Sequence, residues 1–195
     1  MVLGGAGLKE RAGDNVGYDL PGHCIAAPAP PQWLFKLEQG LPMTDKKWAY
    51  EDFAEGATID LGEKHVTAQE IIEFASEFDA QPMHLDEEAG KASILGGLSA
   101  SGWHTCAMFM KMMCDAFLLD STSQGAPGVD HVRWKKPVLA GDTLRGRSTV
   151  TALRESRSRP ELGFVTVSHE LSNQRGEVVL ELQNTGMFLK RRAAA

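Results

Sequence analysis

One long apolar segment, residues 103–119, constrains the fold of this chain more than any other feature. Its polar side chains are those of His104, Thr105, Lys111 and Asp115. Spacings of seven and four residues place His104, Lys111 and Asp115 on one narrow face of a helix, and the rest of the helix surface is apolar. We therefore predict a long helix that is buried on nearly all sides, and a sheet that wraps around it.

The C-terminal part of the chain is predicted to supply this sheet. Turn motifs such as "LAGD" and "NQRG" separate four strand-like segments, at 128–138, 142–153, 163–171 and 177–190. The last two show the clearest strand alternation. Because consecutive strands joined by short turns pair antiparallel, the pattern predicts an α+β fold with an antiparallel β-sheet wrapped around a long central α-helix.

The N-terminal part is predicted to be an arm followed by smaller elements. Residues 1–42 contain seven glycines and five prolines and show neither a helical nor a strand period. We expect a flexible arm there, followed by one domain at 43–195. Within the domain, two short strands are expected at 50–67. A helix follows at 68–78, because apolar side chains recur on one helix face at Ile71, Phe74, Ala75 and Phe78.

The charge distribution argues against one class of partner and favours another. The formal net charge is −6, and no basic block occurs before the last few residues, which argues against nucleic-acid binding. Residues 121–195 nevertheless hold 12 Lys and Arg against 7 Asp and Glu. This local surplus suits an anionic ligand such as a phosphate.

The cysteines, the histidines and the hydropathy argue against a disulfide framework, a metal site and membrane association. An odd number of cysteines without paired spacing predicts neither a disulfide framework nor a zinc site, and fits a reducing cytoplasm: Cys24, Cys106 and Cys114. The chain has neither a secretory signal nor 18 consecutive apolar residues, so we expect no membrane association. Four histidines lack metal-ligand spacing, and no metal site is predicted from them: His65, His104, His131 and His169.

A short segment, "DAQPMHLDEE", is the strongest candidate for chemistry. It places Asp79 five residues before His84, and Pro82 lies between them. Since Pro82 disfavours helical geometry at the preceding residue, we expect both side chains in a turn before a short helix at 86–93. An acid and an imidazole held together are suited to proton transfer. The alternative is a helix cap and a surface histidine.

A glycine-rich segment, "GGLSASGWH", precedes the apolar helix. Glycine allows close approach of a ligand to the backbone, and the first N–H groups of a helix can stabilise a developing oxyanion. The alternative is a plain loop with Ser99 or Ser101 as the helix N-cap.

Together these motifs resemble a known family. The runs "FASEFDAQPMHLDEEAGKASILGGLSASGWHT", "RWKKPVLAGDTLRGRSTVTALRESRSR" and "NQRGEVVLELQN" are similar, in family order, to the MaoC-like dehydratases, also called R-specific enoyl-CoA hydratases. The resemblance covers roughly residues 48–190. It implies the hot-dog fold, and either addition of water to a trans-2-enoyl-CoA or dehydration of an R-3-hydroxyacyl-CoA.

The family motif Asp-x-Asn-Pro-x-His implies roles for individual residues. Asp79 and His84 fall on its catalytic acid and histidine, and the N–H of Gly102 would polarise the thioester carbonyl. Pro82 falls on the motif proline. Gln81 replaces the usual Asn, so its amide is expected to keep a hydrogen bond with shifted geometry. Two further departures are Phe78, where a glycine is common, and Met110, near the position of a serine found in some members.

The resemblance also implies a substrate site without a metal or cofactor, coenzyme A entering as part of the substrate. Gln81, Pro82 and Trp103 are expected at this site, and Trp103, Met108 and Met112 are candidates for the acyl pocket, with core packing as the alternative for each. The expected cations for the CoA phosphates are Arg133, Lys135 and Lys136, with a solvated strand end as the alternative.

The expected assembly is a homodimer or a dimer of dimers, because hot-dog domains usually pair their sheets. Two other functions remain open at this point. One is an acyl-CoA thioesterase on the same fold. The other is a non-catalytic acyl-CoA-binding or nodulation-type protein.

Overall fold

The computed structural model describes residues 46–191. The arm predicted at 1–42 and the predicted start of the domain at residue 43 lie outside this range. The described elements are, in chain order, η2 (Tyr50–Asp52), β1 (Thr58–His65), α2 (Ala68–Phe78), α3 (Pro82–Leu85), α4 (Glu87–Ala92), α5 (Gly102–Ala116), η3 (Leu118–Asp120), β2 (Val129–Trp134), β3 (Thr143–Glu155), β4 (Leu162–Ser172) and β5 (Val178–Leu189).

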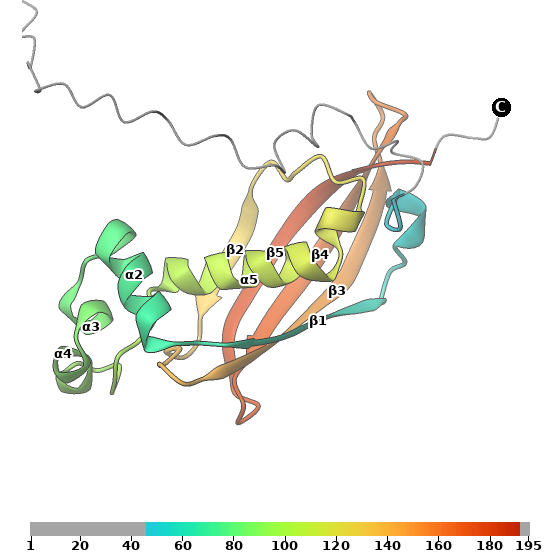
Figure 1. The fold of residues 1–195 in the computed structure, drawn as a ribbon. Helices are drawn as coiled ribbons and strands as arrows, with labels where there is room; N and C mark the ends of the chain where they lie inside the picture. Colours follow the sequence, from blue (N-terminus) through green and yellow to red (C-terminus); the bar gives the residue numbers. More distant parts are fainter. Residues whose placement is uncertain (1–45, 192–195) are drawn as a thin grey trace, which may run out of the picture. The chain divides into compact units, whose positions relative to one another are not determined.

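The predicted sheet around a long helix is confirmed. The five strands form one antiparallel sheet in the order β1-β3-β4-β5-β2. Helix α5 runs across one face of this curved sheet, and α2, α3 and α4 gather at the end where α5 begins (Figure 1). Buried apolar side chains from α5 and from the facing strands make the core, among them Phe109, Met113, Leu144 and Leu180.

The position of β2 differs from the simple order of consecutive strands. It pairs with β5, with Val132 opposite Leu182, and it does not pair with β3. The connection that follows β2 contains Pro137 and pairs its backbone elsewhere. Ala100 N–H donates to Val138 O at 2.8 Å. This segment is therefore held against the start of α5 and does not form a hairpin.

The prediction of two short strands within 50–67 is wrong, since only the second half of this segment is a strand. The first half turns through η2 and buries Phe53 in an aromatic cluster. The Phe53 ring centroid lies 4.6 Å from that of Phe188 and 5.5 Å from that of Trp48. Burial of this side chain outweighs the weak local alternation.

Helix α5 is not buried on nearly all sides within one chain. Trp103 and Met110 are 63% and 47% exposed, and Lys111 lies on the same surface. His104, which the helix spacing groups with Lys111, is buried instead. Its ring stacks on Phe74 of α2, with centroids 4.6 Å apart. The outward face of α5 is therefore open, and it carries both apolar and charged side chains.

The helices before α5 follow the sequence closely. Thr67 is the N-cap of α2, and it forms a capping box with Glu70. The short helix expected at 86–93 is α4, with Asp86 as its N-cap. The turn expected around His84 is a one-turn helix, α3, which begins at Pro82. Within residues 46–191, no helix is both long and apolar enough to cross a membrane.

Candidate active site

His84 is held in one orientation by the segment that leads into α5. The side chain is buried, and its Nδ1 donates a hydrogen bond to the carbonyl oxygen of Ser99 at 2.7 Å. Because a carbonyl only accepts, the ring proton of the neutral imidazole is on Nδ1. Nε2 therefore carries a free lone pair and can accept a proton.

Asp79 ends α2, and both of its carboxylate oxygens are occupied by neutral donors. The Gln81 amide donates to Oδ1 at 2.7 Å, and the Ser101 hydroxyl donates to Oδ2 at 2.5 Å. The hydrogen bond from Ser101, and then that from Gln81, lower the pKa of Asp79 below its ordinary value, against a smaller opposing effect of burial. The carboxylate is therefore ionised at neutral pH.

The two candidate side chains face each other across a short gap. Asp79 Oδ2 lies 3.9 Å from His84 Nε2. This separation is too long for a direct hydrogen bond. A single water molecule about 2.8 Å from each atom, a normal hydrogen-bond length for oxygen donors, would bridge a separation of this length. The distance between the carboxylate and the proton acceptor is thus compatible with a bridging water.

Gly102 begins α5 beside this pair, and a side chain at this position would displace the Trp134 ring. A Cβ at Gly102 would meet the ring of Trp134 at 2.6 Å. The indole Nε1 of Trp134 donates to the Gly102 carbonyl oxygen at 2.9 Å. The Gly102 N–H belongs to the first helical turn, whose N–H groups lack intrahelical acceptors. It is available to a ligand oxygen atom that approaches the N-terminal end of the helix.

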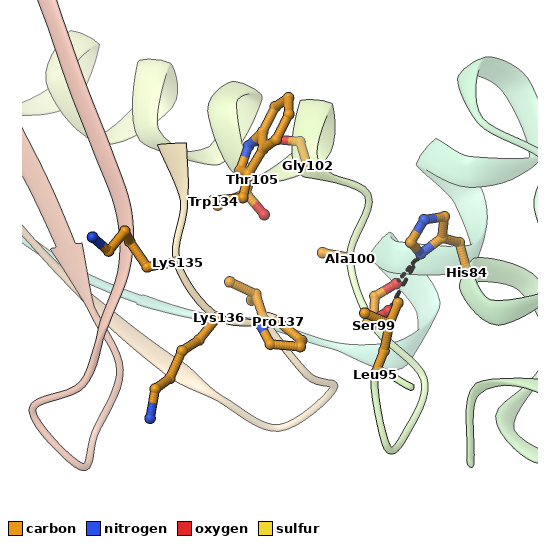
Figure 2. Close-up of a pocket in the computed structure, with 11 residues that line it drawn as sticks. His84, Leu95, Ser99, Ala100, Gly102, Thr105, Trp134, Lys135, Lys136 and Pro137 are labelled. Atoms are coloured by element: carbon orange, nitrogen blue, oxygen red, sulfur yellow. Dashed lines mark hydrogen bonds between the residues drawn. The ribbon is translucent and has the colours of Figure 1, made fainter. Parts of the chain in front are cut away.

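A pocket of about 310 Å³ connects His84 and Gly102. Figure 2 shows His84 on one side of it, and Trp134 and Lys135 on the other. Its lining residues are His84, Leu95, Ser99, Ala100, Gly102, Thr105, Trp134, Lys135, Lys136, Pro137 and Val138. Asp79 is outside this set and adjoins it through His84. The pocket is of the size that holds a small ligand.

The sequence-predicted residues fall into two groups. His84, Gly102, Lys135 and Lys136 line the pocket. Several others do not line it, namely Gln81, Pro82, Trp103, Arg133, Met108 and Met112. Met108 and Met112 are buried in the core, so core packing accounts for both. Trp103 stacks edge-on against Trp134 with ring centroids 5.4 Å apart, outside the lining.

The three basic residues near the pocket each have an acidic partner. Lys136 Nζ lies 2.5 Å from Glu177, and Lys135 Nζ lies 3.5 Å from Glu181. Arg133 lies 4.0 Å from Glu181. Hydrogen bonds from Asn173 and then from Lys136 and Arg175 lower the pKa of Glu177 to about 2. An anionic ligand would have to compete with these carboxylates.

Two contributors to the site are not predicted by the sequence. Trp134 falls in a strand-like segment, although its ring forms a wall of the pocket. Ser101 is an N-cap, as the sequence suggests, but its contact with Asp79 spans 22 residues of sequence. No local spacing signals either contact. Within residues 46–191, no group of three or more His, Cys, Asp or Glu side chains is arranged to hold a metal ion.

The curved antiparallel sheet around one helix is the hot-dog fold, which this chain shares with MaoC-like dehydratases and R-hydratases. The model of the MaoC-like domain family matches residues 52–173, and the chain belongs to this family.

Several known proteins are similar to the chain. The uncharacterized protein YdeM of Bacillus subtilis is 30% identical over 131 residues, which are 67% of this chain and 92% of YdeM. The crystal structure of the MaoC-like dehydratase from Rhodospirillum rubrum is 38% identical with a TM-score of 0.67, covering 74% of this chain and 99% of that one. Mesaconyl-CoA hydratase of Cereibacter sphaeroides is 48% identical over 68 residues, 35% of this chain but only 20% of that enzyme.

Proposed function

We propose that the protein is an acyl-CoA hydratase or dehydratase. In the hydration direction it would add water to a trans-2-enoyl-CoA, and in the reverse direction it would dehydrate an R-3-hydroxyacyl-CoA. One observation carries the proposal, namely the ionised Asp79 and the free Nε2 of His84, 3.9 Å apart beside the N-terminus of α5. Family membership and the MaoC-like dehydratase relative support the same reaction class.

The residues suggest a division of labour in hydration. A water held by Asp79 and His84 attacks carbon 3 of the enoyl group, one of its protons is taken up by the pair, and a proton is delivered to carbon 2. Acid–base groups placed in this way contribute roughly 10² to 10⁴ in rate. The Gly102 N–H meets the charge that develops on the thioester oxygen, without reorganisation of the helix. These steps use protein groups and water.

The CoA portion is proposed to enter from the side of Lys135 and Lys136, with Arg133 close by. Phosphate oxygens would replace Glu181 and Glu177 as partners of these cations. Charge-assisted hydrogen bonds of this kind are stronger than those between neutral groups. Because the cations are exposed, their contribution should fall as salt is added.

The acyl group is proposed to be short. The pocket is about 310 Å³, and Met108 and Met112 pack in the core instead of lining a long acyl channel. The similarity to mesaconyl-CoA hydratase favours short branched or dicarboxylic enoyl groups among the candidates. Crotonyl-CoA, mesaconyl-CoA and a longer trans-2-enoyl-CoA therefore form the substrate series to test.

A second copy of the chain is the proposed partner. Strand β2 is at one edge of the described sheet, and backbone groups at a sheet edge can pair with another strand. The exposed side chains of Trp103, Met110 and Trp134 lie beside this edge and on the open face of α5. A homodimer would cover both. Sedimentation velocity of the wild type and of Trp103→Glu would test this, because a charge at a buried interface dissociates it.

The decisive experiment follows the enoyl-thioester absorbance of the three substrates with wild type, Asp79→Asn and His84→Ala, while free thiol is measured in parallel. Absorbance loss that depends on both residues, without thiol release, supports the hydratase. Thiol release from a saturated acyl-CoA would identify a thioesterase. Ligand-induced thermal stabilisation without any product would identify a binding protein.

A further inference from the structure

Ser101 connects the N-terminus of α5 to the carboxylate of Asp79. The side chain is 1% exposed. Its Oγ accepts a hydrogen bond from Trp103 N–H at 3.2 Å and donates one to Asp79 Oδ2 at 2.5 Å. The direction of both bonds is fixed, because an N–H only donates and an ionised carboxylate only accepts.

We propose that Ser101 is a positioning residue for Asp79. Its hydroxyl holds the carboxylate in the ionised form and keeps Oδ2 directed at the gap beside His84 Nε2. The inference rests on the proposed function for its catalytic meaning, whereas the effect of Ser101 on Asp79 is a property of the folded protein. Ser101 itself is not among the residues that line the proposed substrate pocket.

The hydrogen-bond chain makes the Ser101 hydroxyl a strong donor. A hydroxyl that accepts a bond is polarised and donates more strongly, and this effect is larger in a buried site. The accepted bond comes from the first turn of α5, where the helix dipole is positive. The Ser101 hydroxyl thus couples the positive end of the α5 dipole to the Asp79 carboxylate.

The backbone around Ser101 is firmly held. Its carbonyl oxygen accepts from the Thr105 N–H at 2.9 Å and from the Thr105 hydroxyl at 3.2 Å. The Ala100 N–H donates to Val138 O at 2.8 Å. Because the Ser99 carbonyl in the same segment orients His84, residues 99–101 orient both members of the pair. This short segment therefore sets the separation between the carboxylate and the imidazole.

Gln81 holds the other oxygen of Asp79 less firmly. Its side chain is exposed, so water competes for the amide and for Oδ1. By comparison, the Ser101 bond is part-buried, it is 2.5 Å long, and it comes from a residue that is only 1% exposed. Loss of the Ser101 hydroxyl should therefore affect Asp79 more than loss of the Gln81 amide.

Few charged groups lie near enough to obscure a change in the pKa of Asp79 when the Ser101 hydroxyl is removed. His84 on α3 acts on the Asp79 carboxylate, and it lowers the pKa least among the contributing groups. Glu73 and Glu77 on α2 are exposed, and His104 on α5 is buried against Phe74. A shift in the titration of Asp79 on removal of one neutral hydroxyl can be assigned to that hydroxyl.

The test compares Ser101→Ala, Ser101→Gly and Ser101→Thr. Glycine is tolerated as an N-cap and lacks the hydroxyl, so it guards against a folding defect in the alanine variant. Threonine keeps a hydroxyl and should restore the contact. Ser121→Ala is the matched control, because Ser121 is a buried serine that donates to Leu118 O and accepts from Ser123 N–H near η3, away from the site.

The first readout is direct titration of Asp79 by NMR of protein labelled with ¹³C at the aspartate carboxyl carbon, the resonance being assigned with Asp79→Asn. We expect the pKa of Asp79 to rise in the alanine and glycine variants, to stay near the wild-type value in the threonine variant, and to be unchanged in Ser121→Ala. An unchanged titration in both hydroxyl-free variants overturns the proposal.

The second readout is the pH profile of kcat/KM with the best enoyl-CoA. Removal of the hydroxyl should lower kcat about 10- to 100-fold, in keeping with a lost hydrogen bond to a charged group, and move the acid limb to higher pH. The KM should change little, and threonine should recover most of the rate. If the wild type shows no hydratase activity while the NMR shift is present, the proposed function fails and the role of Ser101 in positioning Asp79 stands.

Discussion

The Ser99 carbonyl oxygen and the Nδ1 atom of His84 are 2.7 Å apart, and this contact decides which nitrogen of the imidazole is reactive. It turns Nε2 toward the carboxylate that lies 3.9 Å away. A residue 15 positions along the chain thus selects the tautomer of the candidate catalytic histidine.

Replacement of either member of the pair should remove most activity without unfolding the protein. We expect Asp79→Asn to lower kcat by about 10² to 10⁴, because the amide keeps the shape of the carboxylate but cannot accept a proton. His84→Gln should have an effect of similar size. Enoyl-thioester hydration and circular dichroism are the paired measurements. Wild-type rates in both variants would exclude the assigned site.

The contact between Gly102 and Trp134 predicts a sharp contrast between two glycine variants. Gly102→Ala places a methyl group 2.6 Å from the indole ring, and we expect a loss of about 1–3 kcal/mol in the free energy of unfolding. Gly97→Ala is the control, since its Cβ would meet Leu139 at an ordinary 3.6 Å. Urea unfolding measures both. Trp134→Ala in the Gly102→Ala background should recover part of the loss, and equal stability of the two glycine variants would argue against the clash.

A buried histidine on the sheet should make stability depend on pH. Nδ1 of His169 lies 2.7 Å from the Ser148 hydroxyl, and Nε2 lies 2.9 Å from the Asn184 side-chain oxygen. Burial lowers the pKa of His169 from 6.5 to about 4. The unfolded chain therefore binds a proton at His169 more readily than the folded protein does. The free energy of unfolding should have its full value above pH 6.5 and should fall as the pH decreases toward 4.

As the pH falls through this window, the free energy of unfolding should decrease by about 1.4 kcal/mol for each pH unit, or by about 3 kcal/mol in total. Urea unfolding at several pH values, for wild type and His169→Gln, measures it. The variant should be less stable at pH 7 but should show a shallower dependence between pH 6.5 and 4. Parallel curves for the two proteins would mean that His169 does not carry the effect.

Replacing the basic and the acidic members of the ion pairs beside the pocket should change the KM for an acyl-CoA in opposite directions. Lys135→Ala combined with Lys136→Ala should raise the KM for an acyl-CoA and leave kcat nearly unchanged, because remote binding is lost. Glu181→Gln should lower the KM, since it frees Lys135 and Arg133 for phosphate. Added salt should reduce both differences. Arg145→Ala is the control, because its partner Glu63 lies at the opposite edge of the sheet.

Much of the fold can be predicted from the sequence because its signals are local. Thr67 and Glu70 cap α2 within one turn, and the apolar periodicity of α2 and α5 and the strand segments of β3, β4 and β5 lie in continuous stretches. The proximity of Asp79 and His84 is also local, since Pro82 starts the one-turn helix that carries His84. Capping, helix periodicity and the backbone limits of proline act over a few residues, so the sequence determines them without reference to the rest of the fold.

The tertiary structure alone decided the contacts that join distant segments. It placed β2 beside β5, left Trp103 on an open face of α5, and packed Met108 and Met112 into the core. It also brought Ser101 to Asp79 and Trp134 to Gly102. These contacts depend on how the faces of α5 are shared between the sheet, α2 and the solvent. Burial of apolar side chains between segments far apart in the sequence settles that division, so no single stretch of sequence contains it.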